Sequence, residues 1–371
     1  MRLRHPLALV AVLCCAAGCA SVAPVSGPPR TGAPETSDAR YSALLRVLGA
    51  MLTPPPPTFA VMDSARLETG MRYRIAFLAE PADARFHEPP DEIHAYLFVP
   101  DHEGGQRLPA VVAIHQDGPQ SHLGAREPAG LAGAPDQHYG LELFERGYVV
   151  LCPDRFGHAE RRRLPPGDTS TVNPERDDML FEHRVGQLML EGRTAFGKET
   201  YDLMRAVDVL AALPYVDADR IGAIGHSAGG NALVYLMFAD PRVRAGVSSC
   251  GFFDLVRFYD EEAPRRRLTA AALPGLLEAG TAADYLAYVA PRPLLLTRGL
   301  WEWGRDEPWG TYSEQHAEET RTMEAHARRR YDALGASSAL RVEYFEDEGG
   351  NHAFPLRLRN LAYDWLDANL R

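Results

Sequence analysis

Ser227 is the residue whose neighbours most clearly indicate chemistry in this chain. It stands at the centre of Gly225-His226-Ser227-Ala228-Gly229, after a predicted strand, 220–224, and before a stretch of helical character, 228–238. A G-x-S-x-G pattern between a strand and a helix predicts a sharp turn that exposes the serine hydroxyl. We therefore expect Ser227 to be the nucleophile of an acyl transfer. The backbone N–H of Ala228, at the start of the helix, is expected to stabilise the negative charge that develops.

A serine hydroxyl needs a base to take its proton, and His352 is the predicted base. It lies on a glycine-rich loop, 348–354, directly after the last expected strand. In folds with this turn the partners follow in the order serine, acid, histidine. The acid is therefore expected between them, on the loop after the strand predicted at Leu294–Thr297. Glu302 and Asp306 both lie on that loop, and either would orient the imidazole and stabilise the imidazolium that forms.

The second oxyanion donor is expected on the loop after the third predicted strand, Ala110–His115. The backbone N–H of Gln116 is our candidate for this donor. We interpret His115 as a hydrogen-bonding residue at the strand end and not as a second base. The loop lacks the His-Gly-Gly-Gly run of many lipases and esterases.

In these motifs the chain resembles the dienelactone hydrolase and acetyl xylan esterase-like branch of the α/β-hydrolases, over about residues 70–370. The segments that carry the likeness are His115-Gln116, Glu127-Pro128-Ala129-Gly130, Gly147-Tyr148-Val149-Val150, Pro153-Asp154, Val216-Asp217, the serine pentapeptide and Gly350-Asn351-His352-Ala353-Phe354.

The resemblance implies a serine–acid–histidine triad and no metal or organic cofactor. Similar enzymes place the acid three positions after a turn glycine, which is Glu302 here, so Glu302 is preferred over Asp306. Two departures matter. Dienelactone hydrolases use a cysteine nucleophile where this chain has Ser227, so dienelactone chemistry is not expected. The acid is glutamate where aspartate is usual.

The elements around these residues predict an α/β fold, with a mostly parallel eight-stranded sheet flanked by helices. The expected strands are Tyr73–Leu78, Glu92–Val99, Ala110–His115, Val149–Pro153, Ile221–Gly225, Gly246–Ser249, Leu294–Thr297 and Arg341–Phe345. The expected helices are Tyr41–Met51, Tyr139–Arg146, Tyr201–Leu213, Ala228–Phe238, Gln315–Leu334 and Arg359–Leu370. The first two strands are expected to be antiparallel, because few residues separate them. Two longer segments, 156–198 and 252–288, are expected to form short lid insertions.

The N-terminus has the pattern of an export signal. Arg2 and Arg4 precede a short apolar run that ends in Ala16-Ala17-Gly18-Cys19, which is similar to a bacterial lipobox. We predict a lipoprotein-type signal peptide over 1–19, a tether rich in proline and alanine over 20–40, and a catalytic domain over 41–371. The alternative is secretion with cleavage after Ala23. The protein is thus expected in the cell envelope, held by a lipid on Cys19, and otherwise periplasmic or extracellular.

The net charge limits the classes of partner that we expect, and the cysteine content limits the covalent and metal sites. The net charge of −11 argues against nucleic acid and against anionic membrane surfaces, apart from the lipid anchor. Cys152 and Cys250 each end an apolar run, and we interpret both as small core residues and not as a disulfide or metal site.

The predicted substrate is a carboxylic ester, either a small molecule or an esterified carbohydrate. Trp301 and Trp303 lie on the acid loop with Trp309, where aromatic faces would stack on a sugar ring, although such tryptophans more often serve packing. The main alternative is a peptidase of the prolyl-oligopeptidase type. A non-catalytic cell-surface binding protein on a hydrolase scaffold is the third hypothesis.

Overall fold

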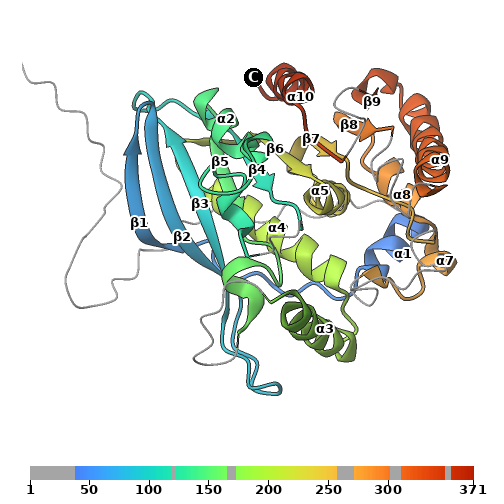
Figure 1. Ribbon diagram of the computed structural model, residues 1–371, viewed down its shortest axis with the longest axis horizontal. Helices are drawn as coiled ribbons and strands as arrows, with labels where there is room; N and C mark the ends of the chain where they lie inside the picture. Colours follow the sequence, from blue (N-terminus) through green and yellow to red (C-terminus); the bar gives the residue numbers. More distant parts are fainter. Residues whose placement is uncertain (1–37, 118–121, 165–172, 257–270, 301–310, 347–351) are drawn as a thin grey trace, which may run out of the picture.

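The structure is a computed structural model, and it describes residues 38–117, 122–164, 173–256, 271–300, 311–346 and 352–371. A single nine-stranded sheet runs through it, in the order β1-β2-β3-β5-β4-β6-β7-β8-β9 (Figure 1). The strands are β1 (Phe59–Leu67), β2 (Gly70–Glu80), β3 (Asp91–Pro100), β4 (Leu108–Ile114), β5 (Val149–Pro153), β6 (Val216–His226), β7 (Val243–Ser249), β8 (Leu294–Gly299) and β9 (Leu340–Phe345).

The predicted fold class is confirmed, with one correction to the strand number. The eight predicted strands are β2 to β9, and β1 is the ninth, pairing antiparallel with β2 at the sheet edge. Strands β1, β2, β3 and β5 form antiparallel pairs, whereas β5, β4, β6, β7, β8 and β9 are parallel to their neighbours. Most residues of β1 are exposed, so it lacks the apolar pattern by which a buried strand is recognised.

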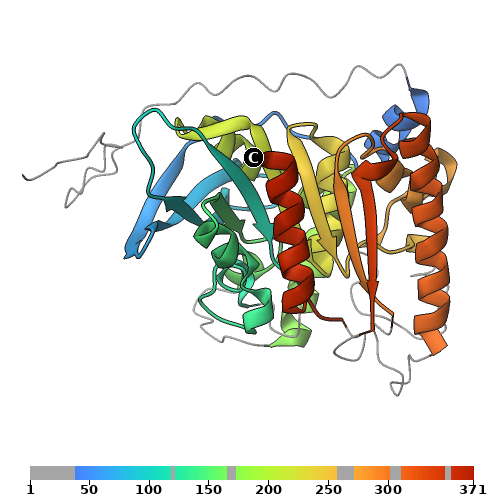
Figure 2. The same ribbon diagram turned by 90° about the horizontal axis from the view of Figure 1, so that it is seen from above.

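Helices cover both faces of the sheet. They are α1 (Ala39–Val47), α2 (Tyr139–Glu145), α3 (Pro174–Leu190), α4 (Ala195–Ala212), α5 (Ala228–Ala239), α7 (Leu276–Ala279), α8 (Ala282–Ala287), α9 (Thr311–Ala333) and α10 (Leu356–Leu370), with short 3-10 turns η1 (Gly124–Arg126), η2 (Pro135–Gln137), η3 (Ala159–Arg162) and η5 (Ser337–Ala339). The larger core joins one face to α1, α4, α5, α8 and α9, and a second core joins the other face to α2 and α10 (Figures 1 and 2).

The parallel strands determine where a site can form. β4 and β5 are buried along their whole length, as expected for strands covered on both faces. Because parallel strands end at the same edge, the loops that leave β4, β5, β6, β7, β8 and β9 emerge together. Every predicted triad and oxyanion residue follows one of these strands.

The two insertions differ in their packing. In the first, α3 forms a small separate cluster with Phe156, in which Phe181, Val185 and Leu188 are buried. In the second, the described part belongs to the larger core, where Tyr285 of α8 is fully buried and its hydroxyl donates to the carbonyl of Leu44.

The first described helix, α1, has a side-chain cap at its N-terminus. The side chain of Asp38 accepts hydrogen bonds from the backbone N–H groups of Arg40 and Tyr41, which caps α1. The predicted signal, Cys19 and most of the predicted tether lie outside the described residues. Among the helices of the described residues, none has the length and apolar character needed to span a membrane.

Candidate active site

Ser227 occupies the sharp turn that its pentapeptide predicts. It lies between the end of β6 and the start of α5, with φ 54° and ψ −125°, a conformation that L-residues rarely adopt. Its backbone N–H donates a 2.7 Å hydrogen bond to the carbonyl of Ser249, and its own carbonyl accepts one of 2.9 Å from Asn231. These bonds hold a strained residue that remains partly exposed.

The flanking glycines are required by close backbone contacts. A Cβ on Gly225 would lie 2.4 Å from the carbonyl carbon and oxygen of Gly229. A Cβ on Gly229 would lie 2.2 Å from the carbonyl oxygen of Ile114 and 2.6 Å from that of His115. The start of α5 therefore packs directly on the end of β4.

This contact brings the two predicted oxyanion segments together. Ala228 is the first residue of α5, so its N–H has no acceptor within the helix. Gln116 lies just beyond the end of β4, and its side-chain amide donates a 3.0 Å hydrogen bond to Glu127. Burial raises the pKa of Glu127. The Gln116 side chain is thus occupied, which leaves the backbone as the oxyanion donor we predict for this residue.

His115 is engaged through both ring nitrogens. Nδ1 lies 2.7 Å from the carbonyl of Gln116, and Nε2 accepts a 3.0 Å hydrogen bond from the backbone N–H of Arg155. This pairing assigns the proton to Nδ1. Burial, with the nearby His158, holds the pKa of His115 well below its ordinary value. His115 is a hydrogen-bonding residue of the strand end, in agreement with the interpretation from the sequence.

Arg155 is a positioning residue that the sequence analysis did not single out. It is buried, its Nε pairs with Glu199 on α4, and its Nη1 donates 2.6 Å to Asp117 and 3.3 Å to the carbonyl of His115. It therefore links α4 to the loop that carries Gln116. The only sequence signal was its place directly after the β5 strand end.

His352 lies beside the serine turn. Its ring centroid is 4.9 Å from that of His226, the residue before Ser227. Phe354, fully buried, stacks on His226 at 6.0 Å, and the thiol of Cys250 lies 3.6 Å from the carbonyl of Ala353. The described residues 352–354 thus lie against the end of β6, where the predicted base would have to be. Sequence reasoning missed His226 because it stands at a variable position of the motif.

The predicted acids lie outside the described residues, as do Trp301 and Trp303. The chain that leads to Glu302 and Asp306 is described up to Leu300, whose N–H donates a 2.9 Å hydrogen bond to the carbonyl of Phe345. The predicted acid loop thus leaves the sheet next to the loop that carries His352.

Cys152 and Cys250 are both buried, as the sequence predicted. Cys152 ends β5, and burial raises the pKa of its thiol well above the ordinary value. Cys250 follows β7 and takes a positive φ of 46°.

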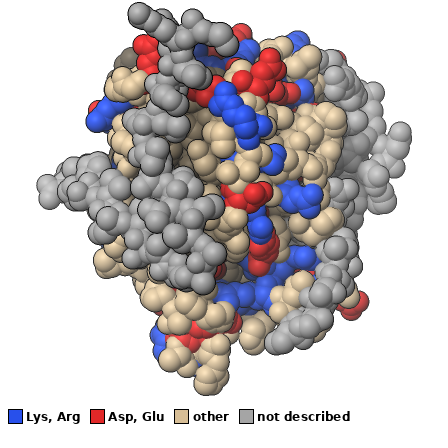
Figure 3. All heavy atoms as spheres, turned by 90° about the vertical axis from the view of Figure 1, so that its left-hand side faces the viewer, with Lys and Arg blue, Asp and Glu red and all other residues tan. Residues whose placement is uncertain are grey.

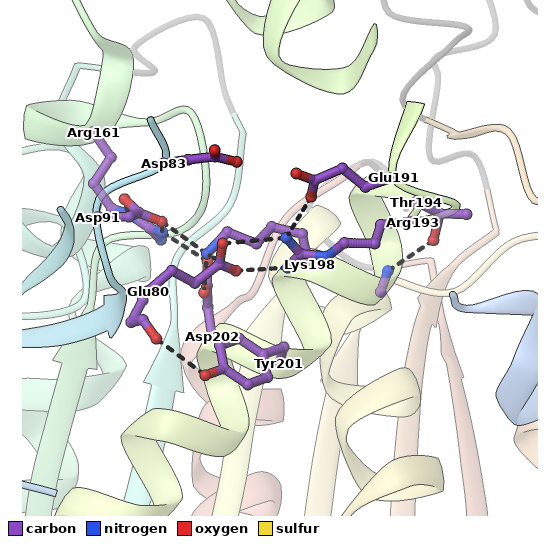
Figure 4. A network of polar contacts seen from close by, with 12 residues as sticks. Glu80, Asp83, Asp91, Arg161, Glu191, Arg193, Thr194, Lys198, Tyr201 and Asp202 are labelled. Carbon is purple, nitrogen blue, oxygen red and sulfur yellow. Dashed lines mark hydrogen bonds and ion pairs between the residues drawn. The ribbon is translucent and has the colours of Figure 1, made fainter. Parts of the chain in front are cut away.

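A network of buried charged side chains connects β2 and β3 to η3 and α4 (Figure 4). Lys198, fully buried on α4, contacts Glu80 at 2.9 Å, Asp91 at 2.7 Å and Asp202 at 2.5 Å. Arg161 of η3 bonds Asp91 and Asp202, each at 2.7 Å. Burial raises the pKa of Asp91, but the charges of Arg161 and Lys198 outweigh burial and hold that pKa well below its usual range.

The network ties several elements together. Arg193 adds a 2.6 Å bond to Glu80, and Arg163 lies 3.7 Å from Asp91, so four cations contact the carboxylates Glu80, Asp91 and Asp202. These residues come from β2, β3, η3 and the region of α4. A buried charge that loses its partners is costly, so the network fixes the relative positions of these elements.

The chain is similar to several known proteins. A model of the prolyl oligopeptidase family matches residues 188–300, which contain the serine turn. YtaP of Bacillus subtilis (strain 168) is 27% identical over 207 residues, which cover 56% of this chain and 64% of that protein. Dipeptidyl-peptidase 5 of Porphyromonas gingivalis is 29% identical over 162 residues, 43% of this chain and 19% of that protein. The chain thus spans less than two thirds of the length of these curated relatives.

Solved structures match over most of the chain. A glucuronoyl esterase from Solibacter usitatus has a TM-score of 0.55 at 14% identity, covering 91% of this chain and 93% of that one. Acetyl xylan esterase 1 from Thermoanaerobacterium sp. JW/SL YS485 has a TM-score of 0.52 at 17% identity, covering 90% and 94%. At such identities the likeness shows a shared fold.

The chain has the α/β-hydrolase fold. The resemblance predicted from its motifs is confirmed at this level, and the solved structures that the chain matches include an acetyl xylan esterase. The family model ends at residue 300 and therefore does not reach the segment that carries His352.

Proposed function

We propose that this α/β hydrolase is a serine esterase that cleaves carboxylic esters through an acyl-enzyme on Ser227. The observation that carries the proposal is the strained turn of Ser227, with the ring of His352 beside the adjacent His226. A serine held in this way has its hydroxyl directed away from the backbone that packs around it. A histidine at the same place is the base that such a serine requires.

The reaction follows from these roles. His352 takes the proton from Ser227 Oγ as this oxygen attacks the ester carbonyl carbon, and the backbone N–H groups of Gln116 and Ala228 bind the oxyanion. The alcohol leaves with the proton that the imidazolium returns. Water then repeats the cycle at the acyl-enzyme and releases the acid. Glu302, with Asp306 as the alternative, would hold the imidazole in the required tautomer.

The proposed substrate class is esterified carbohydrate. Support comes from the folds of a glucuronoyl esterase and an acetyl xylan esterase, which this chain shares over about nine tenths of its length. Trp301 and Trp303 are proposed to stack on a sugar ring of the substrate.

A peptidase of the prolyl-oligopeptidase type is the second candidate. The family model over 188–300 and the match to dipeptidyl-peptidase 5 favour it. The described residues before β4 form α1 and three antiparallel strands of the same sheet, so this part of the chain contains no propeller. The esterase is the preferred proposal because the esterase structures match about nine tenths of this chain, whereas the peptidase family model matches only residues 188–300.

A substrate screen separates the two candidates. The purified protein is assayed with nitrophenyl esters, acetylated oligosaccharides and proline-containing peptide amides, with the Ser227→Ala variant as control. Hydrolysis of esters that is lost in the variant supports the esterase. Serine-dependent cleavage of the peptide amides with no ester turnover would establish the peptidase instead.

We further propose that the protein is exported and anchored to the cell envelope by a lipid on Cys19. The support is the pattern at 16–19, followed by the proline-rich stretch that serves as tether. In the native host, the full-length protein should partition into detergent, and Cys19→Ala should release it or block its processing. A soluble mature form beginning at Pro24 would contradict the anchor.

A further inference from the structure

A cavity of about 570 Å³ lies where β2 and β3 meet η1 and η3. Cationic and imidazole side chains dominate its walls. They are Arg74, His94, His122, Arg126, Arg162 and Arg163. We call this cavity the arginine pocket. Such a concentration of guanidinium groups is notable in a chain whose net charge is −11.

The arginines elsewhere are mostly balanced by acids. On the side of the molecule that carries β1, basic and acidic side chains lie intermingled (Figure 3). Arg66 and Asp101, both exposed, form such a pair at 2.5 Å. The arginine pocket departs from this pattern at Arg126. Within the described ranges, no ion pair or side-chain hydrogen bond involves the Arg126 guanidinium, although it is exposed and lines the cavity.

His122 adds an unused polar atom to the same wall. Its Nδ1 is buried and has no hydrogen-bond partner among the described residues. Burial, followed by the charges of Arg162 and Arg126, lowers the pKa of His122, so the ring is neutral at pH 7. A neutral imidazole next to a free guanidinium is able to donate a hydrogen bond to an anionic oxygen.

Two carboxyl groups, Asp154 and Glu160, line the pocket, and Asp154 accepts a 2.7 Å hydrogen bond from the backbone N–H of Ala125. Glu160 pairs with Arg74, and its Oε2 lies 3.2 Å from Nδ1 of His94. This arrangement shows that the cavity walls are suited to a carboxylate. Arg126 of η1 and His122, which precedes η1, form no ion pair with an acid among the described residues.

The wall formed by η3 is held in place. Arg161 bonds Asp91 and Asp202 in the buried charge network, and its Nη1 donates 3.2 Å to the carbonyl of Asp154. Arg162 bonds the carbonyl of Ala159 at 2.9 Å. The pocket is therefore preformed, which lowers the entropic cost of binding.

The pocket lies on the same edge of the sheet as Ser227. Asp154, which lines the pocket, directly precedes Arg155, whose N–H holds His115. From β3 to β6 there are three strand spacings, roughly 14 Å in all. One oligosaccharide can therefore reach both places.

We propose that the arginine pocket binds a carboxylate of the substrate, so that the enzyme prefers esterified carbohydrates that also carry a uronic acid. This inference rests on the proposed esterase function and adds a second point of substrate recognition. Arg126 is the principal group in contact with the carboxylate. The carboxylate takes no part in the chemistry at Ser227.

The test compares two substrates that differ only in charge. One is an acetylated xylo-oligosaccharide with a glucuronic acid branch, and the other is the same compound with the branch reduced to glucose. Wild type should show a kcat/KM for the acidic substrate about tenfold higher, because a charge-assisted hydrogen bond contributes discrimination of this order. Arg126→Gln should bring the ratio close to one while leaving para-nitrophenyl acetate hydrolysis within about twofold of wild type.

Arg244→Gln is the matched control. Arg244 is also exposed but lies at the amino end of β7, paired with Asp219, and its loss should leave the ratio unchanged. A wild-type ratio of one, or a ratio that survives Arg126→Gln, overturns the proposal. A third substrate with sulfate in place of the carboxylate tests the commitment to carboxylate, and preference for sulfate alone overturns that commitment.

A binding measurement tests the arginine pocket independently of the proposed esterase activity. If no ester is hydrolysed, the deacetylated acidic oligosaccharide is titrated calorimetrically into Ser227→Ala. Binding that disappears in Ser227→Ala/Arg126→Gln supports the pocket even though the esterase proposal fails. No binding to Ser227→Ala overturns the pocket.

Discussion

The backbone N–H of Leu300 donates a 2.9 Å hydrogen bond to the carbonyl of Phe345, at the matched ends of β8 and β9. The loop with both predicted acids therefore starts beside the loop with His352. Whichever carboxylate serves the triad, it has to reach the histidine from this common origin. The choice between them is open to a direct experiment.

Glu302→Gln should remove most activity with little change in KM. Without the acid the imidazole takes the wrong tautomer, and in a well-studied serine protease this costs on the order of 10⁴-fold in kcat. Asp306→Asn should stay within about tenfold of wild type. Steady-state kinetics on a nitrophenyl ester decide the matter. The reverse pattern would assign the acid to Asp306, and equally mild effects would place it elsewhere.

A fluorophosphonate probe should label Ser227 covalently, because only an activated serine attacks it at an appreciable rate. Ser227→Ala should abolish labelling and lower kcat by about 10⁴-fold or more, with circular dichroism unchanged. Mass spectrometry of the peptide that contains position 227 identifies the site. Labelling that persists in the variant would disprove the assignment.

Gly229→Ala should destabilise the protein severely, because the new methyl group would lie 2.2 Å from the backbone oxygen of Ile114. Gly186→Ala is the control, since a Cβ there in α3 meets no atom within 4 Å. It should stabilise the protein by up to about 1 kcal/mol through helix propensity. Urea unfolding measures both variants. Equal stabilities would mean that the start of α5 does not pack on β4 as described.

Lys198→Met should lower the free energy of unfolding by about 3–5 kcal/mol, since it leaves buried carboxylates without their central cation. Arg66→Met, which breaks the exposed pair with Asp101, should cost less than about 1 kcal/mol. Both are measured by urea unfolding at pH 7. A similar small loss in both would show that the network contributes little to stability.

Asp154→Asn should change how stability depends on pH. Burial raises the pKa of Asp154 from 3.8 to about 7, outweighing the N–H of Ala125 and the charge of Arg161, while Glu160 adds to the increase. Between these values the folded state retains a proton that the unfolded state has lost. Wild type therefore loses up to about 1.4 kcal/mol of stability for each pH unit gained in this window.

The Asp154→Asn variant does not titrate at this position, so it lacks this decrease of stability with pH. Its side-chain oxygen can still accept the hydrogen bond from the N–H of Ala125. Its stability relative to wild type should consequently rise from pH 5 to pH 7, as measured by urea unfolding at each pH. A relative stability that stays constant or falls over this range would contradict a raised pKa at Asp154.

The sequence was sufficient for features that are local or periodic. Eight strands were predicted, and β6 proved longer than predicted because Val216 already pairs with Leu108. β1 was missed since its exposed side chains have no core-facing pattern. The turn at Ser227 was predictable because five consecutive residues specify it.

Contacts between distant residues were beyond sequence reasoning. Arg155 meets Glu199 across 44 positions, and Lys198 meets Asp91 from another element altogether. Neither pair has a sequence spacing or a motif from which the contact could be predicted. The triad acid stays a prediction because Glu302 and Asp306 lie outside the described residues.

Lys198 is the only lysine in the chain and its side chain is fully buried. The exposed cationic side chains are therefore guanidinium groups, together with any histidines that are protonated. Guanidinium keeps its proton at every pH a folded protein tolerates, whereas lysine ammonium is lost near pH 10.4. The folded surface thus has no side-chain amine for acylating reagents to modify, and its positive charge stays constant far into the alkaline range.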